Sequence, residues 1–265
     1  MDTAALIELC DLNYVEAMRE LTRRAGGTVV DEDGLMLYAG VHPLPVLVNG
    51  VMRTSDRLDA TAVLARADAF FGARGRGFTI AARAHADEDL VRAAGAAGLN
   101  SYGSPPAMVL DHRLPDAVPP SGVELRRVAT AADVAAFAEV NGRAYATYGM
   151  PADVAPAVLG PSATVIAPHI VAFVAFADGA PVAAAMTIVT HGVAGVYWVG
   201  TVPEVRGRGL AELCTRAAGN AGFDLGARIA ALQASPMGEP VYRRMGYVEV
   251  TRYPQLVRFQ PRAAR

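Results

Sequence analysis

A glycine-rich turn in the last third of the chain has the residue types of a phosphate-binding site. An apolar segment leads into the run Gly200-Thr201-Val202-Pro203-Glu204-Val205-Arg206-Gly207-Arg208-Gly209-Leu210-Ala211, and an amphipathic segment follows it. The first N–H groups of a helix lack partners within it and carry the positive end of its dipole, so they bind anions, and glycine lets a phosphate come close. Arginine side chains in such a turn also suit a pyrophosphate. The turn therefore predicts an anion site at a helix start.

The residues around this turn exclude several nucleotide cofactors. A dinucleotide fingerprint that begins with Gly207 and Gly209 needs a third small residue at position 212, where the chain has Glu212. A flavin or nicotinamide oxidoreductase is therefore disfavoured. A Walker loop and a pyridoxal Schiff base both need a lysine, and the sequence contains none.

A second segment, residues 229–247, follows the turn. Residues 229–232 predict a buried strand. Pro240 suits the first turn of a helix, and Gly246 suits the left-handed position that ends one. The pattern predicts a short helix that carries Tyr242.

The order Arg206-x-x-Gly209-x-Ala211, followed by Tyr242 and then Met245-Gly246-Tyr247, resembles the signature of the GNAT superfamily of N-acetyltransferases. The resemblance covers residues 123–265. It implies acetyl-CoA as cosubstrate, with its pyrophosphate on the turn amides and its acetyl-pantetheine arm beside the strand end. The implied cofactor contacts are Thr201, Val202, Arg206, Gly207, Arg208, Gly209, Leu210, Ala211 and Ser235.

The resemblance also implies that Tyr242 is the general acid. Acetyl transfer from a thioester to an amine expels a thiolate, and a phenol with a pKa of about 10 stays protonated at neutral pH yet can donate as the thiolate forms. The alternative is that Tyr242 only packs its ring under the helix.

Two positions depart from the family pattern. Members often have an asparagine seven residues before the tyrosine, and this chain has Ser235 there, expected either as a weak cofactor contact or as a cap of the turn before Pro236. No carboxylate lies in residues 196–202. Glu204 and His191 are expected to be ordinary turn residues, so no general base is assigned, and a water chain or an amine that arrives neutral would satisfy the chemistry.

The acceptor is expected to contact residues 141–164, the part of the domain that recognises acceptors in the superfamily. Tyr145, Tyr148 and Met150 are the candidates to line its pocket, with core packing as the alternative. Their aromatic and apolar character favours a small-molecule amine or a peptide N-terminus over a polycation.

Composition indicates a globular chain with a large core. The 265 residues are 52% hydrophobic and carry a formal net charge of −2. No run approaches the ~20 apolar residues of a membrane span, and the start lacks the basic flank of a signal peptide, so a cytoplasmic location is expected. The charge argues against nucleic acid, and the dispersed histidines give no metal site. The expected partner is an amine acceptor, with no nucleic acid and no membrane, and a homodimer is left open.

The proline-rich residues 114–122 predict a linker between domains at 1–113 and 123–265. The second domain reads as the alternating strands and helices of the GNAT α/β fold. Part of the first, residues 44–110, repeats this order with an offset of about 148 residues and ends in a closing strand at 108–110.

The first repeat has lost its chemical positions. It has no glycine turn at residues 53–57, and Ala94 stands where the second repeat has Tyr242. We therefore expect tandem GNAT-like domains, each a twisted mixed α/β sheet flanked by helices, with the first one degenerate. The alternative is that residues 1–113 form an unrelated α/β cap.

The sequence leaves two functions from different classes open. One is an acetyl-CoA-dependent N-acetyltransferase in which the amine attacks the thioester directly and Tyr242 acts as general acid. The other, favoured by the missing base, is a non-catalytic acyl-CoA-binding sensor or scaffold.

Overall fold

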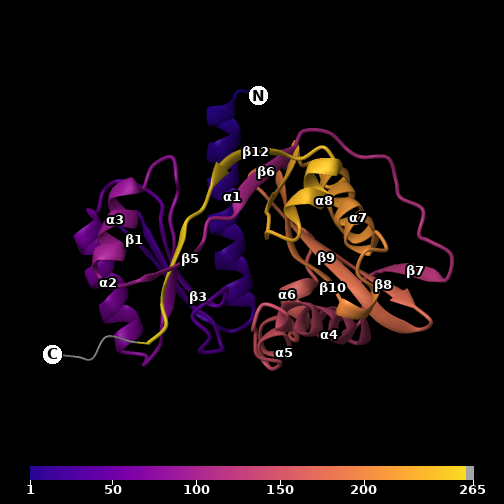
Figure 1. Ribbon diagram of the computed structural model, residues 1–265, viewed down its shortest axis with the longest axis horizontal. Coiled ribbons are helices and arrows are strands. Elements are labelled where there is room, and N and C mark those ends of the chain that lie inside the picture. The colour runs from indigo at the N-terminus through magenta and orange to yellow at the C-terminus, as the bar shows by residue number, and fades with distance from the viewer. Residues whose placement is uncertain (261–265) are drawn as a thin grey trace.

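The computed structural model describes residues 1–260 as two mixed β-sheets flanked by helices (Figure 1). The six-stranded sheet has the order β1-β2-β3-β4-β13-β5, and the seven-stranded sheet has the order β12-β6-β11-β10-β9-β8-β7. Helix α1 (Thr3–Arg24) stands between the two sheets (Figure 1). The predicted architecture of two mixed α/β sheets is confirmed.

The first half of the chain builds most of the six-stranded sheet. Its elements after α1 are β1 (Thr28–Glu32), β2 (Leu35–Ala39), β3 (Asn49–Arg53), α2 (Ala60–Gly72), β4 (Phe78–Ala81), α3 (Glu88–Ala96), β5 (Asn100–Gly103) and β6 (Pro106–Leu110). The strand predicted from residue 44 begins only at Asn49. Pro43 and Pro45 precede it, and proline has no N–H to give to a ladder.

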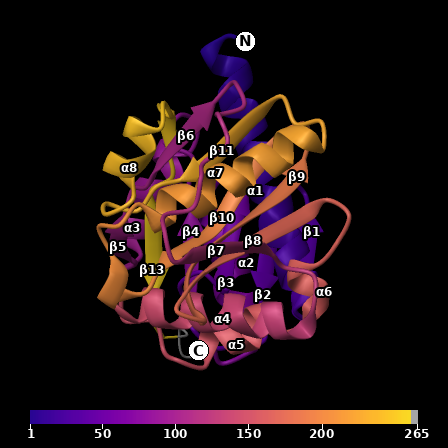
Figure 2. The same ribbon diagram turned by 90° about the vertical axis from the view of Figure 1, so that its right-hand side faces the viewer.

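The second half builds most of the seven-stranded sheet. Its elements are β7 (Val123–Arg127), α4 (Ala131–Ala146), α5 (Val154–Leu159), α6 (Ser162–Val165), β8 (Ile170–Ala177), β9 (Ala180–Thr190), β10 (Val193–Thr201), the 3-10 turn η1 (Pro203–Val205), α7 (Leu210–Asp224), β11 (Ile229–Gln233), α8 (Glu239–Arg244), β12 (Val248–Arg252) and β13 (Gln255–Arg258). Helices α7 and α4 lie on opposite sides of strands β8 to β10 (Figures 1 and 2).

Local sequence fixes the start of α4 and the entry into β10. Thr130 Oγ1 accepts from the N–H of Asp133 at 3.2 Å, and the Asp133 carboxylate accepts from the N–H of Thr130 at 2.9 Å, which makes a capping box. The β9–β10 hairpin turns at His191 and Gly192, whose φ angles are 53° and 74°. Two left-handed residues in a two-residue turn match the twist of the flanking strands. His191 is therefore a turn residue, as expected.

The two halves exchange a strand. Strand β6 lies between β11 and β12 in the second sheet, antiparallel to both, with Met108 opposite Leu232 and Glu249. Strand β13 lies between β4 and β5 in the first sheet, with Leu256 opposite Ile80. In Figure 1 the yellow C-terminal segment accordingly crosses from the second half into the first.

One expectation about the first repeat is therefore wrong. Residues 108–110 are a strand, but they close the second sheet, and β13 fills the corresponding place in the first. Such an exchange leaves the local pattern of each strand unchanged, because an apolar strand buried on both faces suits either sheet. The linker at 114–122 and the domain limits on either side of it stay predictions.

Helix α1 joins the halves through one apolar core. Three of its buried residues belong to a cluster with members from both sheets, which includes Tyr14, Ala17, Leu21, Met36, Tyr38, Tyr197 and Trp198. A second cluster, under α2 and α3, belongs to the first sheet and includes Phe71, Phe78 and Leu90. The two halves thus share an apolar core.

The first half contains a buried ion network where the repeat aligns it with the glycine turn and Ser235 of the second half. Arg53, at the end of β3, donates from Nε to Asp87 at 2.8 Å and from Nη2 to Asp89 at 2.6 Å. Arg83 binds both oxygens of Asp87 at 2.9 Å. The offset of about 148 residues aligns Asp87 with Ser235. The network joins the end of β3 to the start of α3. Charged side chains of the first half therefore pair with one another at the place that corresponds to the predicted anion site of the second half.

We expect Asp87→Asn to destabilise the protein by about 3–5 kcal/mol, because breaking a fully buried ion pair leaves a buried charge uncompensated. Asp87 is 0% exposed, whereas the Asp89 side chain is 46% exposed. The matched variant Asp89→Asn is therefore expected to cost about 1 kcal/mol or less. Urea unfolding of both variants measures the difference, and equal losses would contradict the buried role of Asp87.

Acid adds a check on the same network. Burial alone would raise the pKa of the Asp87 carboxyl, but hydrogen bonds and charge from Arg83 and then Arg53 hold it below its usual value. A depressed pKa in the folded state gives stability that is present above about pH 4, where the unfolded carboxyl is ionised, and is lost as the pH falls through the folded value. Asp87→Asn should therefore reduce the acid dependence of stability.

Candidate functional site

The glycine-rich turn forms an open anion-binding loop at the start of α7. Strand β10 ends at Thr201, η1 follows, and α7 begins at Leu210. Gly207 and Gly209 have φ angles of 78° and 75°, and a Cβ atom at either would meet nothing within 4 Å. Helix α7 begins only after these two glycines, because a right-handed helix excludes their φ values. Both glycines thus face open space.

The backbone amides of residues 207–212 have no hydrogen-bond acceptor within residues 1–260. The first amide of α7 that finds one is that of Leu213, which donates to Gly209 O at 3.0 Å. No side chain caps this helix start. Consecutive unpaired N–H groups at a helix N-terminus form an anion site, and the missing Cβ atoms leave room for a phosphate. These residues fit a diphosphate.

The two arginines of the turn differ in what they contact. Arg206 donates from Nε to Thr201 O at 3.2 Å and from Nη2 to Ala144 O at 3.2 Å. Its amide donates to Pro203 O at 3.4 Å, so Arg206 is used inside the protein to hold the turn against α4. Arg208 is exposed and forms no hydrogen bond or ion pair with the described residues. Arg208 is therefore the arginine available to a bound anion.

Strand β10 separates from its neighbour β11 before it reaches the turn. The two parallel strands pair only from Val193 to Gly195 of β10, and β10 then continues to Thr201 beside β9 alone. Thr201 is in register with Ala183, and Val202 donates its N–H to Val182 O at 2.9 Å. The edges of β10 and β11 that face each other beyond Gly195 are thus free of ladder partners.

A β-bulge lies on β10 where the strands part. The register with β9 shifts between Tyr197 and Gly200, and Trp198 has a φ of 50°. Trp198 is 9% exposed, and its ring centroid lies 5.3 Å from that of Tyr145. A bulge redirects backbone groups and side chains, and bulges are frequent beside functional sites. The left-handed position is a tryptophan and not a glycine, so no local signal in the sequence indicates the bulge.

Tyr242 lies in α8 with its side chain buried against α7. It is 7% exposed, and its ring centroid is 6.0 Å from that of Tyr247. Burial raises the pKa of its hydroxyl, Tyr247 raises it further, and Thr215 lowers it. Thr215 is fully buried, and its Oγ1 has no hydrogen bond of regular geometry. The Tyr242 hydroxyl is therefore protonated at neutral pH and lies beside the hydroxyl of Thr215.

Ser235 caps the turn that precedes α8. Its Oγ accepts from the N–H of Gly238 at 3.1 Å, which is the capping role expected as one alternative. The same Oγ accepts from the hydroxyl of Tyr148 at 3.4 Å. The contact of Ser235 with a cofactor stays a prediction.

Aromatic side chains from α4 and β10 gather near Tyr242. Tyr145 and Tyr148 have ring centroids 6.1 Å apart, and Met150 is buried below them in the loop. Tyr148 is 45% exposed. Both tyrosines lie close enough to Tyr242 to interact with it electrostatically. The structure thus brings the predicted pocket residues and the predicted acid together, although they are almost a hundred residues apart in sequence.

No described carboxylate hydrogen-bonds to these aromatic residues. Glu204 is paired with Arg143 at 3.1 Å and is exposed. Hydrogen bonding to its own backbone, together with Arg143, lowers the pKa of its carboxyl. The structure therefore adds no general base to the site.

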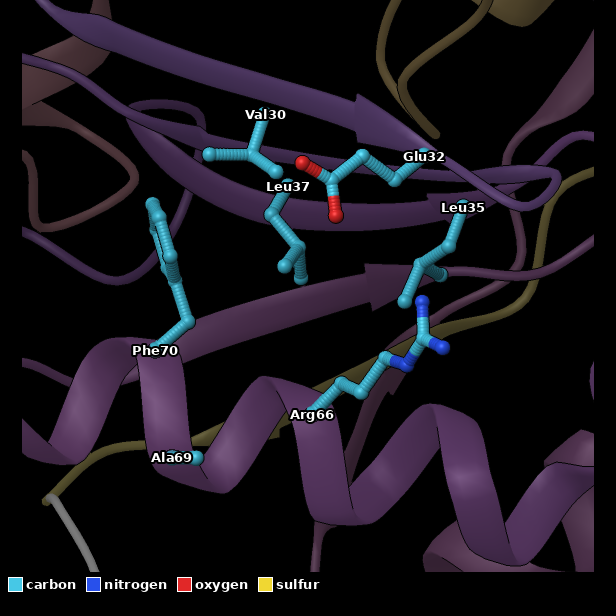
Figure 3. Close-up of a pocket in the computed structure, with 7 residues that line it drawn as sticks. All are labelled: Val30, Glu32, Leu35, Leu37, Arg66, Ala69 and Phe70. Atoms are coloured by element: carbon cyan, nitrogen blue, oxygen red, sulfur yellow. The ribbon is translucent and has the colours of Figure 1, made fainter.

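A surface hollow elsewhere does not belong to this site. It lies in the first half between β1–β2 and α2, and it is lined by Val30, Glu32, Leu35, Leu37, Arg66, Ala69 and Phe70 (Figure 3). Strand β1 is the sheet edge in this half, whereas its counterpart β8 is covered by β7. The hollow therefore lies beside a sheet edge that no strand covers within residues 1–260.

Known proteins match this chain at the level of the fold, among solved structures. No family model and no curated protein sequence matches the chain. Among solved structures, a GCN5-related N-acetyltransferase from Kribbella flavida is 23% identical, with a TM-score of 0.71 over 93% of each chain. A GCN5-related N-acetyltransferase from Sphaerobacter thermophilus is 16% identical, with a TM-score of 0.60 over 89% of this chain and 84% of that one.

A tandem GNAT protein from the clavulanic acid biosynthesis pathway is also similar. It is 16% identical, with a TM-score of 0.59 over 87% of this chain and 79% of that one. The chain therefore has the fold of the GCN5-related N-acetyltransferases in tandem form, and the predicted resemblance is confirmed at the level of the fold. No helix within residues 1–260 has the length and apolar character to cross a membrane.

Proposed function

We propose that the protein is an acetyl-CoA-dependent N-acetyltransferase whose active site lies in its second half. The observation that carries the proposal is the row of unpaired amides at residues 207–212, set on two glycines that face open space. A diphosphate is the ligand that such a row suits best. The parting of β10 and β11 supports it, because it leaves the facing edges of the two strands free to pair with an extended pantetheine arm.

The donor would be held by backbone groups and by one arginine. The amides of Gly207, Gly209 and Leu210 face the pyrophosphate in this assignment, and Arg208 contributes the free guanidinium. In the same assignment Thr201, Val202 and Ser235 contact the pantetheine arm, and Arg206 supports the turn through its bond to Thr201 O. The bound cosubstrate supplies an activated acyl thioester.

Tyr242 is the proposed general acid. The neutral amine attacks the thioester carbonyl carbon, the C–N bond forms, and the C–S bond breaks. The thiolate takes its proton from the Tyr242 hydroxyl, and the proton on the new amide nitrogen leaves to water. Burial favours the neutral phenol, which is the form that this step needs.

The aromatic cluster of Tyr145, Tyr148 and Trp198 is the proposed wall of the acceptor site. It carries no negative charge, so it suits a small-molecule amine or a peptide N-terminus. The second candidate function, a non-catalytic acyl-CoA-binding module, is favoured by the lack of a carboxylate beside Tyr242.

Release of free thiol from acetyl-CoA in the presence of a panel of amines distinguishes the two functions. Thiol release that depends on the amine supports the transferase. A rise in melting temperature with CoA but no thiol release with any amine would support the binding module.

We expect Arg208→Gln to weaken CoA binding about tenfold, since one exposed, charge-assisted contact to phosphate is lost. Arg57→Gln is the matched control, because Arg57 lies exposed in the corresponding turn of the first half, which lacks the glycines. Isothermal calorimetry measures both dissociation constants. Equal affinities for CoA would show that Arg208 does not contact the phosphates.

A further inference from the structure

We propose that Asn13 of helix α1 is a positioning residue through which the degenerate first half sets the geometry of the donor strand β10. The inference rests on the proposed function. It gives the first half a role in the reaction, although its own turn has been replaced by the Arg53 network.

Asn13 is a buried residue of the first half that contacts the β9–β10 hairpin beside its turn. It is 1% exposed. Its Nδ2 donates to Thr190 Oγ1 at 2.8 Å, and also lies at hydrogen-bond distance from Ile188 O and Val193 O, 3.2 and 3.3 Å away. Its Oδ1 accepts from the hydroxyl of Tyr197 at 2.7 Å. Both ends of this amide are therefore bound to the second sheet.

Gly195 makes the contact between Asn13 and Tyr197 sterically possible. A Cβ atom at position 195 would lie 2.0 Å from Asn13 Oδ1 and 2.5 Å from the Tyr197 ring. Gly195 does not have a positive φ, so backbone conformation does not require glycine there. The glycine is needed because helix and ring approach the strand so closely. Gly195 is also the last residue of β10 that pairs with β11.

The anchor lies directly beside the strained residue of the site. Tyr197 is followed by Trp198, whose φ of 50° is unfavourable for an aromatic side chain. Such a conformation persists only where the surroundings hold it on several sides. Tyr145 packs on the Trp198 ring from α4, and Asn13 holds the preceding residue from α1. The bulge is thus fixed by one element from each half.

The bulge sets the direction of the backbone groups on the unpaired edge of β10. Beyond Gly195 the strand has no partner on the side of β11, so its backbone groups there are placed by the bulge and by the pairing with β9. In the proposed reaction these groups face the thioester. A small displacement of reacting groups lowers the rate by up to about 10²-fold, while binding of the distant pyrophosphate is unaffected.

Tyr197→Phe tests the inference, because it removes only the hydroxyl that binds Asn13. We expect kcat to fall by about tenfold or more, with the dissociation constant for CoA unchanged within about twofold. Tyr253→Phe is the matched control. The Tyr253 hydroxyl is also buried and also donates to α1, to Asp11 Oδ1 at 2.7 Å, but within residues 1–260 it forms no hydrogen bond to β10. This control should change the melting temperature comparably and leave kcat unchanged.

Asn13→Ala should lower kcat as Tyr197→Phe does, and the double variant should lose no more than the stronger single variant, because both remove one link. The inference is overturned if the wild-type protein is active and Tyr197→Phe has the kcat of Tyr253→Phe at equal stability. If the wild-type protein transfers no acetyl group to any amine, the proposed function fails first, and the positioning role fails with it.

Discussion

Tyr242→Phe is expected to lower kcat by about 10²–10⁴-fold while the protein still binds CoA, because the leaving thiolate loses its positioned proton donor. The ring stays, so packing against α7 and Tyr247 is retained. Steady-state thiol release gives kcat, and calorimetry gives the CoA affinity. The two measurements together separate a chemical role from a binding role.

Tyr247→Phe is the control for this variant. Tyr247 is a neighbouring tyrosine that is 4% exposed, and its hydroxyl lies near Gly219 of α7, away from the turn. Its kcat should equal that of the wild-type protein. Unchanged turnover in Tyr242→Phe would show that the ring only packs, which is the alternative that the sequence left open.

The raised pKa of Tyr242 also has a consequence for the pH profile. The group acts in its protonated form, and its pKa lies above the ordinary tyrosine value of about 10. Deprotonation of Tyr242 therefore lowers the activity only at a higher pH than deprotonation of an exposed phenol would. If kcat already falls as the pH is raised toward about 9, the loss comes from another group or contradicts the assignment of Tyr242.

Splitting the chain between Val118 and Pro119 is expected to leave neither fragment folded alone. Fragment 1–118 would keep β6 and lose β13, and fragment 119–265 would have a gap between β11 and β12. Strand β6 is buried along its whole length. Met108, Val109 and Leu110 each contribute about 1.5–3 kcal/mol by burial, a sum comparable to the whole stability of a domain.

Co-expression of the same two fragments should restore one folded complex, because each carries the strand that completes the other's sheet. Size-exclusion chromatography and thermal unfolding measure the outcome. As a control, full-length protein cleaved at a protease site placed after the exposed Val118 should stay a single species. Cooperative unfolding of either fragment by itself would contradict the strand exchange.

Local features of the fold were predictable from the sequence. The capping box at Thr130 and Asp133 places the start of α4 at Ala131, and the repeated order of helices and strands identifies the tandem α/β architecture. The glycine turn follows from residue types alone, because only glycine adopts the observed φ angles at 207 and 209 without strain.

Features that depend on tertiary contacts were not predictable. The pattern of residues 106–110 is the same in either sheet, so nothing local indicates the exchange with β13. The bulge at Trp198 uses a residue that normally avoids positive φ, and it exists because Tyr145 and the Asn13 anchor hold it. Arg206 stays a predicted cofactor contact, and its guanidinium is engaged by carbonyls of α4 and β10, which only the packed structure shows.

Calorimetric titration of the wild-type protein with CoA and, separately, with pantetheine tests the central claim most directly. If the amides of residues 207–212 hold a diphosphate, CoA binds with measurable heat and pantetheine, which lacks the diphosphate, binds far more weakly or not at all. No heat with CoA, or equal affinity for both compounds, would contradict the account.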